Sequence, residues 1–278
     1  MQEGKNKLNV ALVQMQSQTR IEDNYQQAVH YLNEAVSQHK AQLIVFPENF
    51  LCLGVADFSE IASSLNFYID KLASLANELA VSLLLGSVPV NTSENKCLSR
   101  SLLIDADGKN VGHYDKIHLF DVEVGDGQGT YKESDSFQPG IECRVLPLEG
   151  SKLGLSICYD LRFPELFQIL RKDGAEMIAV PSAFTFKTGQ AHWEILLRAR
   201  AIETQCYVLA SNQCGTHSID KTGATRETWG HSMIVDPWGN ILCSLAEKPG
   251  VCSAELDFDY MREIRQSMNL IKHKRLTI

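Results

Sequence analysis

The sequence predicts a single α/β domain in which helices cover mixed β-sheets. Apolar runs of about four to eight residues, the length of buried strands, alternate along the 278 residues with longer segments of helical apolar spacing. Several runs are joined by short turns such as Asp107–Gly108, which indicates antiparallel hairpins. No linker or fixed repeat divides the chain, so we expect one domain over 1–278, with a core at about 8–258 and a tail at 259–278.

The first part of the chain is predicted to alternate strands and helices. The first predicted element is a strand at 8–13, which is an apolar run. The second is a helix at 21–37, where apolar residues recur every three or four positions. By the same two patterns we expect a strand at 43–46, a helix at 65–80, and strands at 81–88, 98–104 and 111–120.

Two polar stretches interrupt the pattern of the second part. Residues 121–140 hold four glycines and no sustained period, and a second polar stretch covers 211–230, so both are predicted to be loops. Long ordered loops in compact domains are usually functional. Around them we expect strands within 145–157, a helix at 164–173, a strand at 177–180, a helix at 189–206, strands at 207–210, 232–235, 241–245 and 251–256, and a final short helix.

Charge and composition exclude several classes of protein. The formal net charge of −8 leaves no basic stripe to replace the counterions of a nucleic acid, and the basic cluster at 272–275 is predicted to be a solvated tail. No apolar run approaches the roughly 20 residues of a membrane span, and the N-terminus lacks the apolar core of a signal peptide. We therefore expect a cytoplasmic protein without nucleic-acid or membrane partners.

The eight cysteines are scattered and form no C-x-x-C pair. A chain of this length needs no disulfide framework, and free thiols suit a reducing compartment. Cys214 and His217 have a spacing seen in metal sites, but a closed zinc site needs four ligands, so no metal is expected.

Cys158 is the strongest candidate for a catalytic residue. It follows the apolar run 153–157, and Pro164 a few residues later favours the first turn of a helix. A strand-to-helix turn holds a side chain rigidly while backbone N–H groups point outward, which suits a nucleophile that attacks a carbonyl. The alternative is a buried structural cysteine.

Glu48 and Lys116 supply what a thiol would need. Pro47 ends the strand 43–46 and Glu48 follows at once, and strand ends in open α/β folds gather in one crevice. Burial is expected to raise the pKa of this carboxyl and make it a competent base, while Lys116 would stabilise an oxyanion. Taken singly, Glu48 could equally cap a helix and Lys116 could be a solvated strand residue.

Together these residues lie in three motifs that resemble the nitrilase, or carbon–nitrogen hydrolase, superfamily over nearly the whole chain. The motifs are Phe46-Pro47-Glu48-Asn49, Tyr114-Asp115-Lys116-Ile117-His118-Leu119-Phe120 and Cys158-Tyr159-Asp160-Leu161-Arg162-Phe163-Pro164-Glu165-Leu166. The resemblance implies that Glu48 is the general base, Lys116 the oxyanion stabiliser and Cys158 the acyl-forming nucleophile. It also implies a supporting role for Glu133, an αββα sandwich, pairing into a homodimer or higher homo-oligomer, and no cofactor.

The resemblance also narrows the reaction. True nitrilases have Trp-Glu after the cysteine, whereas this chain has Tyr159-Asp160, as amide-cleaving branches do. The segments 181–207 and 230–239 look most like the branch that acts on deaminated glutathione. We therefore expect hydrolysis of a terminal carboxamide to carboxylate and ammonia, with ω-amidase activity on short α-keto acid amides as the alternative. The residues expected to contact this small-molecule amide are Tyr159, Arg162, Phe184, Thr185 and Trp193.

Several points stay open at this stage. The segments 121–132 and 218–228 match the branch less well, and both are expected to line the mouth of the pocket. An acidic protein needs a local cation to bind a substrate with carboxylates; Arg162 and Lys187 are the candidates, and Arg162 could instead brace the turn after Cys158.

Two other kinds of protein compete with this interpretation. A cysteine–histidine hydrolase could use His118, which would share the face of Lys116 on an extended strand, or else His192 or His231. A non-catalytic binding protein could also keep the same fold.

Overall fold

Two six-stranded sheets form the centre of the computed structural model, which describes residues 6–94, 96–125, 130–220 and 223–276. The first sheet has, in spatial order, the strands β16 (Gly250–Asp257), β1 (Lys7–Gln14), β2 (Leu43–Val45), β3 (Ser82–Asn91), β4 (Cys97–Ile104) and β5 (Asn110–Asp115). The second has β15 (Ile241–Ser244), β14 (Met233–Val235), β11 (Tyr207–Ala210), β10 (Met177–Ala179), β9 (Ser151–Leu155) and β8 (Val145–Leu148). Both sheets mix parallel and antiparallel pairs, as the sequence predicted.

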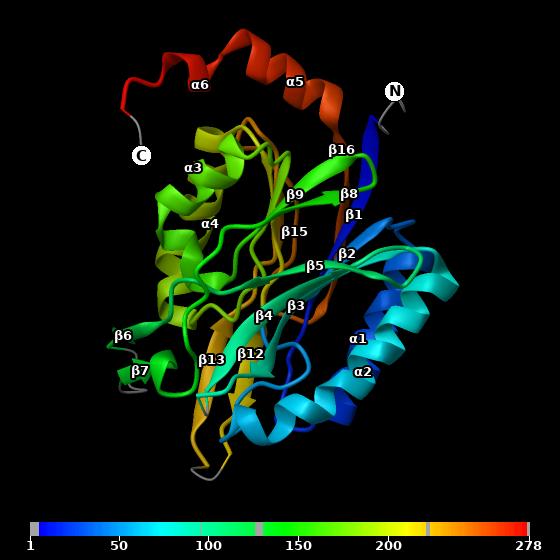
Figure 1. Ribbon diagram of the computed structural model, residues 1–278, viewed down its shortest axis with the longest axis vertical. Helices are drawn as coiled ribbons and strands as arrows, with labels where there is room; N and C mark the ends of the chain where they lie inside the picture. The colour runs from blue at the N-terminus through cyan, green and yellow to red at the C-terminus, as the bar shows by residue number, and fades with distance from the viewer. Residues whose placement is uncertain (1–5, 95, 126–129, 221–222, 277–278) are drawn as a thin grey trace.

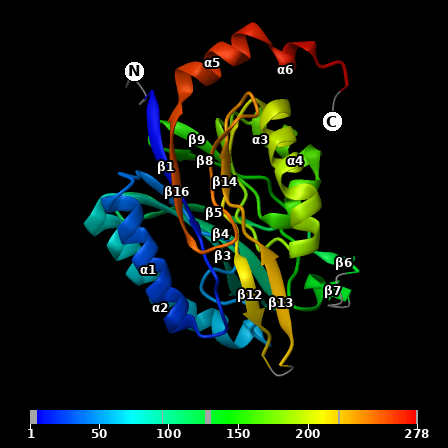
Figure 2. The ribbon, with the colours of Figure 1, turned by 180° about the vertical axis from the view of Figure 1, so that it is seen from behind.

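Helices cover the outer faces of the two sheets. The helices α1 (Ile21–Ser37) and α2 (Phe58–Leu79) lie on the first sheet, and α3 (Pro164–Lys172) and α4 (Phe186–Thr204) lie on the second (Figure 1). Seen from behind, the same four layers follow one another (Figure 2). The fold is therefore the predicted αββα sandwich in a single domain.

The alternation of side chains along β1 explains why the layers form. Leu12 packs in the core between the sheets with Leu155 of β9, whereas the next residue, Val13, packs with Leu32 of α1. Successive side chains of a strand point to opposite faces, so a strand that is apolar at every position is buried on both sides. The continuous apolar runs in the sequence are strands of this kind.

The two stretches predicted as loops each contain a small hairpin, so this prediction was wrong. Residues 121–140 include β6 (Asp121–Glu123), β7 (Thr130–Lys132) and a 3₁₀ turn (Glu133–Asp135). Residues 211–230 include β12 (Cys214–Ser218) and β13 (Thr225–Trp229). The hairpins lie side by side at one end of the molecule in both views (Figures 1 and 2). Both are mostly half-buried or exposed, so they lack the apolar alternation that identifies a strand.

Three other boundaries differ from the sequence-based expectation. Strand β5 ends at Asp115, so Lys116 and His118 lie beyond it rather than on an extended strand. Helix α2 begins at Phe58 rather than at 65, because the Asp57 side chain accepts a hydrogen bond from the Ser59 N–H and caps the helix. Helix α4 begins at Phe186 rather than at 189.

Part of the segment expected to be a tail is packed against the body of the protein. Helix α5 (Phe258–Ser267) buries Met261 and Ile264, and the Arg265 guanidinium donates to the carbonyl of Ala175. A short helix, α6 (Leu270–His273), follows. No helix within the described ranges is both long and apolar enough to cross a membrane.

Candidate active site

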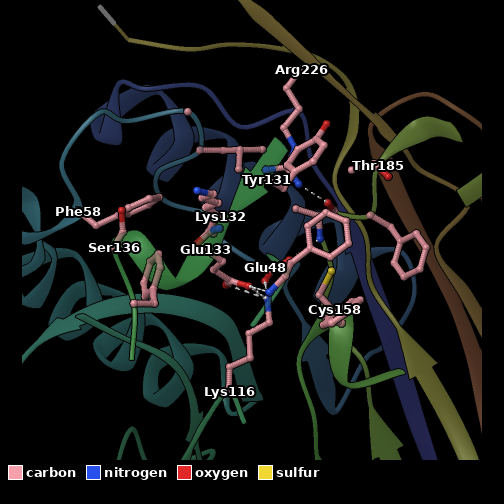
Figure 3. Close-up of a pocket in the computed structure, with 18 of the residues that line it drawn as sticks. Glu48, Phe58, Lys116, Tyr131, Lys132, Glu133, Ser136, Cys158, Thr185 and Arg226 are labelled. Atoms are coloured by element: carbon pink, nitrogen blue, oxygen red, sulfur yellow. Dashed lines mark hydrogen bonds and ion pairs between the residues drawn. The ribbon is translucent and has the colours of Figure 1, made fainter. Parts of the chain in front are cut away.

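Three side chains that follow three different strands meet in one cavity of about 240 Å³. Glu48 follows β2, Lys116 follows β5 and Cys158 follows β9, and Figure 3 shows all three pointing toward one another. The sequence predicted this meeting from the positions of Glu48 and Cys158 after apolar runs. Glu133, which stands in the 3₁₀ turn after β7, lines the same cavity.

Cys158 occupies a sharp turn between β9 and the helix α3. Its φ angle is +47°, in the left-handed region that residues other than glycine rarely adopt. Such strain persists only where the surroundings fix the backbone, and it often marks a functional site. Here the Cys158 N–H donates to the carbonyl of Pro181 at 2.9 Å, and the Ile157 N–H donates to Asp160 at 2.8 Å.

The fully buried carboxylate of Asp160 joins this turn to the segment that carries Lys116. Besides the Ile157 N–H, it accepts hydrogen bonds from the Tyr114 hydroxyl at 2.7 Å and the His118 N–H at 3.0 Å. Because these donors come from both sheets, Asp160 fixes the nucleophile candidate relative to Lys116. We regard Asp160 as a positioning residue.

Lys116 is held between two carboxylates. Its ammonium lies 2.7 Å from Oε1 of Glu48 and 2.9 Å from both carboxylate oxygens of Glu133. Glu133 is fixed in turn, because its Oε2 accepts the Phe120 N–H at 2.7 Å. The Lys116 side chain is only 2% exposed, so its charge is buried and needs partners. The two carboxylates stabilise it both by hydrogen bonds and by their negative charge.

The second oxygen of Glu48 faces the nucleophile candidate. Oε2 accepts the Ala183 N–H at 2.8 Å, and the Cys158 thiol lies beside the same carboxylate in the cavity lining, where each group shifts the pKa of the other. The close approach of the β3 backbone fixes this loop: a side chain at Gly86 would come within 2.2 Å of the carbonyl oxygens of Phe46 and Pro47. Glu48 therefore binds the cation and lies beside the thiol.

The charges of this cluster follow from its burial. Burial alone would raise the pKa of Glu48, but the charge and hydrogen bond of Lys116 outweigh it, so the pKa is lowered. This corrects the expectation that the pKa of Glu48 is raised. Burial raises the pKa of Glu133, and Lys116 offsets only part of that effect.

The same environment keeps the thiol protonated and the amine charged. Burial, reinforced by the charge of Glu48, raises the pKa of Cys158. Burial alone would lower the pKa of Lys116, yet Glu133 and Glu48 raise it. At neutral pH the site therefore holds a thiol, an ammonium and an ionised Glu48 positioned to accept the proton of the thiol.

Of the five residues expected to contact substrate, three line the cavity. These are Tyr159, Phe184 and Thr185. Trp193 does not: it is fully buried, packs against the ring of Phe184 and donates its indole N–H to the carbonyl of His231. Its expected contact with substrate is corrected to support of Phe184.

Arg162 also lies outside the cavity lining. Its guanidinium stands 5.3 Å from the ring centre of Phe184 and hydrogen-bonds to Nδ1 of His192 at 3.2 Å. This arrangement corresponds to the bracing role that the sequence left open. Lys187 donates to the carbonyl of Gly125 at 2.6 Å, which ties α4 to the segment between β6 and β7.

The histidines considered as alternative bases do not reach the cavity lining in the described part of the chain. His118 hydrogen-bonds to Asp160 at 2.7 Å and stacks on Phe163, because the strand expected to carry it ends before Lys116. His192 contacts Arg162, and His231 stacks on Trp229. A cysteine–histidine mechanism is therefore unsupported by this geometry.

The cysteine and histidine with metal-like spacing have other partners. The two ring nitrogens of His217 hydrogen-bond to the Ser17 carbonyl and the Thr228 hydroxyl, each at 2.7 Å. Burial lowers the pKa of His217 to about 4, so this ring is neutral. All eight cysteines, Cys214 among them, are free thiols in the structure.

The segments 121–132 and 218–228 contribute to the cavity lining, as the sequence predicted, but the sequence did not identify which of their residues do so. Tyr131 and Lys132 of β7 and Arg226 of β13 line the cavity, together with Phe58 from the start of α2. Their only signal in the sequence was that 121–132 and 218–228 match the resembled branch less well. A contact made across two polar hairpins leaves no periodic pattern in the sequence.

Comparisons with known proteins agree with this geometry. Residues 9–266 match the family described as carbon-nitrogen hydrolase. The chain is 42% identical over 275 residues to a deaminated glutathione amidase of Yersinia enterocolitica, covering 96% of this chain and 93% of that protein. It is 38% identical to the human protein of the same name, covering 96% of this chain and 82% of that one.

Solved structures show the same fold. The Saccharomyces cerevisiae Nit3 protein, a member of branch 10 of the nitrilase superfamily, has a TM-score of 0.83 at 30% identity, with 98% of each chain covered. The Caenorhabditis elegans NitFhit protein has a TM-score of 0.90 at 37% identity. That comparison covers 99% of this chain and 66% of the longer NitFhit chain.

Proposed function

The chain belongs to the carbon-nitrogen hydrolase family, and we propose that it is an amidase that cleaves deaminated glutathione through a thioester on Cys158. The observation that carries the mechanism is the position of Glu48, which is hydrogen-bonded to the Lys116 ammonium and lies beside the Cys158 thiol in the same cavity. The substrate assignment is supported by the relatives of that name, whose sequences align with almost the whole chain.

The first half of the reaction forms the thioester. Glu48 takes the thiol proton as the Cys158 sulfur bonds to the amide carbon, and the carbonyl oxygen becomes an oxyanion that Lys116 stabilises. The oxyanion then collapses, the carbon–nitrogen bond breaks, and the nitrogen leaves as an amine with the proton held by Glu48. Glu133 takes no proton in this scheme: it holds Lys116 in place.

The second half restores the enzyme. A water molecule attacks the thioester carbon while Glu48 accepts one of its protons. The carbon–sulfur bond breaks, the acid product leaves, and Glu48 returns the proton to the Cys158 sulfur. The net reaction is amide plus water giving carboxylic acid plus amine.

The leaving group separates the two candidate substrates. Deaminated glutathione joins a keto-glutaryl group to cysteinylglycine through a secondary amide, so cleavage of that bond releases a dipeptide amine. The ammonia that we expected from the sequence leaves only from a primary amide, such as α-ketoglutaramate. Both substrates place the same acyl group on Cys158, so the choice between them depends on the leaving-group side.

A direct comparison of the two amides tests the proposal. The purified protein is given deaminated glutathione or α-ketoglutaramate, and the common acid product is measured to obtain kcat/KM for each. We expect a higher kcat/KM for deaminated glutathione. Preference for the primary amide would make the protein an ω-amidase, and absence of turnover on both would favour a non-catalytic binding protein.

An exposed apolar surface supports assembly with a second copy of the chain. Its members are large side chains from α4, β15 and the turn between β14 and β15, namely Ile195, Ile202, Trp238, Ile241 and Leu242. The turn lies against α4, since Arg198 donates to the carbonyl of Gly239 at 2.8 Å. Exposed large apolar side chains on neighbouring elements are typical of interaction sites, and the family resemblance predicts pairing. We therefore propose a homodimer through this face.

We expect the Trp238→Glu variant to shift the protein from dimer to monomer, because it places a charge in an apolar interface. Mass measured by light scattering during gel filtration checks this result. Ile141→Glu is the control, since Ile141 is 90% exposed and lies outside the patch. A wild type that is monomeric at micromolar concentration would contradict the proposal.

The cellular location is also a proposal. The eight cysteines are free in the structure, and free thiols persist in a reducing compartment. We propose the cytoplasm on this ground.

A further inference from the structure

The lining residues are buried at one end of the cavity and more exposed at the other, which distinguishes its base from its mouth. At its base, Glu48, Lys116 and Cys158 are each buried. Toward the two hairpins the lining residues become half-buried or exposed, as Tyr131 and Lys132 are. The base of the cavity therefore holds the reacting groups, and the hairpins β6–β7 and β12–β13 form its mouth.

The positions of the base and the mouth determine which way round a substrate cleaved through a thioester must bind. The acyl half stays bound to Cys158 after the carbon–nitrogen bond breaks, whereas the amine half must leave before water can attack. The amine half therefore has to lie on the path to solvent, at the mouth. Groups that line the mouth meet the leaving group rather than the acyl group.

Arg226 of β13 is a cation at this mouth whose position is fixed. Its Nη2 donates to the carbonyl of Ala183 at 3.1 Å, and its guanidinium lies 5.1 Å from the ring centre of Tyr131. Within the described ranges its polar partner is thus a carbonyl rather than a carboxylate, and its buried Nε has no hydrogen-bond partner. Because Arg226 also lines the cavity, a guanidinium without a carboxylate partner among the described residues can bind an anionic ligand there.

Among the described residues, Lys132 is the other cation that lines the mouth, but a nearby carboxylate offsets part of its charge. It pairs with Asp121 across the β6–β7 ladder, and its charge contributes to the lowered pKa of that carboxyl. Lys132 is also exposed, so water screens its field. Arg226 is therefore the better anion site of the two.

The distance between Arg226 and the reacting groups fits the leaving group. Ala183 accepts from Arg226 at its oxygen and donates to Glu48 from its nitrogen at 2.8 Å. Bond lengths within one residue then limit the separation of Arg226 Nη2 from Glu48 Oε2 to about 10 Å. A dipeptide amine extends about 7 Å from its nitrogen to its terminal carboxylate, so the carboxylate can reach Arg226.

We infer that Arg226 binds the terminal carboxylate of a peptide-like leaving group and so selects peptidyl amides over primary ω-amides. The inference rests on the proposed function and adds to it a residue that sets specificity. Arg162, in contrast, lies behind Phe184, away from the mouth.

Substrates with and without the leaving-group carboxylate test the inference. For Arg226→Gln we expect kcat/KM on deaminated glutathione to fall about 10- to 100-fold, the loss typical of a charged hydrogen bond. The loss on α-ketoglutaramate should be several times smaller, because that substrate has no carboxylate beyond its amide nitrogen. Lys132→Gln removes a neighbouring mouth cation and should reduce kcat/KM on deaminated glutathione less than Arg226→Gln does.

A chemically blocked substrate completes the test. Deaminated glutathione with its glycine carboxylate converted to an amide should be a poor substrate for the wild type, and Arg226→Gln should discriminate little between the blocked and free forms. Equal losses on all substrates, or none, would overturn the inference while leaving the proposed function intact. A wild type inactive on deaminated glutathione would overturn the proposed function itself, and the inference with it.

Discussion

Replacing Cys158 with alanine is expected to lower kcat by about 10⁴- to 10⁶-fold, the range seen when a nucleophile is removed. The loss is this large because the thiol forms the bond that splits the hydrolysis into two easier steps. Steady-state kinetics on deaminated glutathione provide the measurement. The matched control is Cys143→Ala, which removes a half-buried thiol that does not line the cavity.

The same residue should carry the acyl group during turnover. Intact mass spectrometry of the wild type, quenched in acid during turnover of a slow amide, should reveal a species heavier by one acyl group, and peptide mapping should locate it at Cys158. Cys158→Ala should give no such species. An active Cys158→Ala enzyme, or an adduct on a different cysteine, would contradict the thioester mechanism.

Two members of the candidate catalytic cluster, Glu48 and Cys158, could be predicted from the sequence because they follow apolar strands. Residues 43–46 and 153–157 are predicted strands, and Glu48, one residue beyond the first, and Cys158, directly after the second, reach the cavity. Lys116 was expected within a strand, yet it lies just after one. The difference arises because the segment from Lys116 onward is held by hydrogen bonds to Asp160 and Glu133, partners distant in sequence that no local pattern shows.

The mouth of the pocket could not be predicted in the same way. Strands β6 and β7 alternate between exposed and half-buried positions, and β13 reads Thr-Arg-Glu-Thr-Trp, so neither hairpin has an apolar face that a periodic pattern would detect. What places Arg226 is its contact with Ala183 and Tyr131, from two other parts of the chain. The proposed specificity therefore depends on contacts between segments that the sequence left as loops, while the proposed reaction depends mainly on residues at strand ends that it identified.

The contrast between two buried glutamates tests which of them moves protons. Glu48→Gln should lower kcat by about 10²- to 10⁴-fold, the usual contribution of a general base. Glu133→Gln should cost less, because Glu133 contacts Lys116 but does not contact the thiol in the structure. His118→Asn should also cost less than Glu48→Gln, since His118 contacts Asp160 and Phe163 but does not line the cavity. Kinetics of the three variants side by side give the order.

The pH dependence of kcat/KM for the wild type is a second test of Glu48 as the general base. The pKa of Glu48 is lowered from its ordinary value of 4.5, so the base stays ionised until the pH falls below that value, and the acid limb of kcat/KM that it controls should lie there. A histidine base would place this limb near its ordinary pKa of about 6.5.

Glu48 also compensates the buried charge of Lys116, so each variant is accompanied by a thermal unfolding measurement. A folded Glu48→Gln enzyme with near-wild-type kcat, or a larger loss in His118→Asn, would move the role of base from Glu48 to another group.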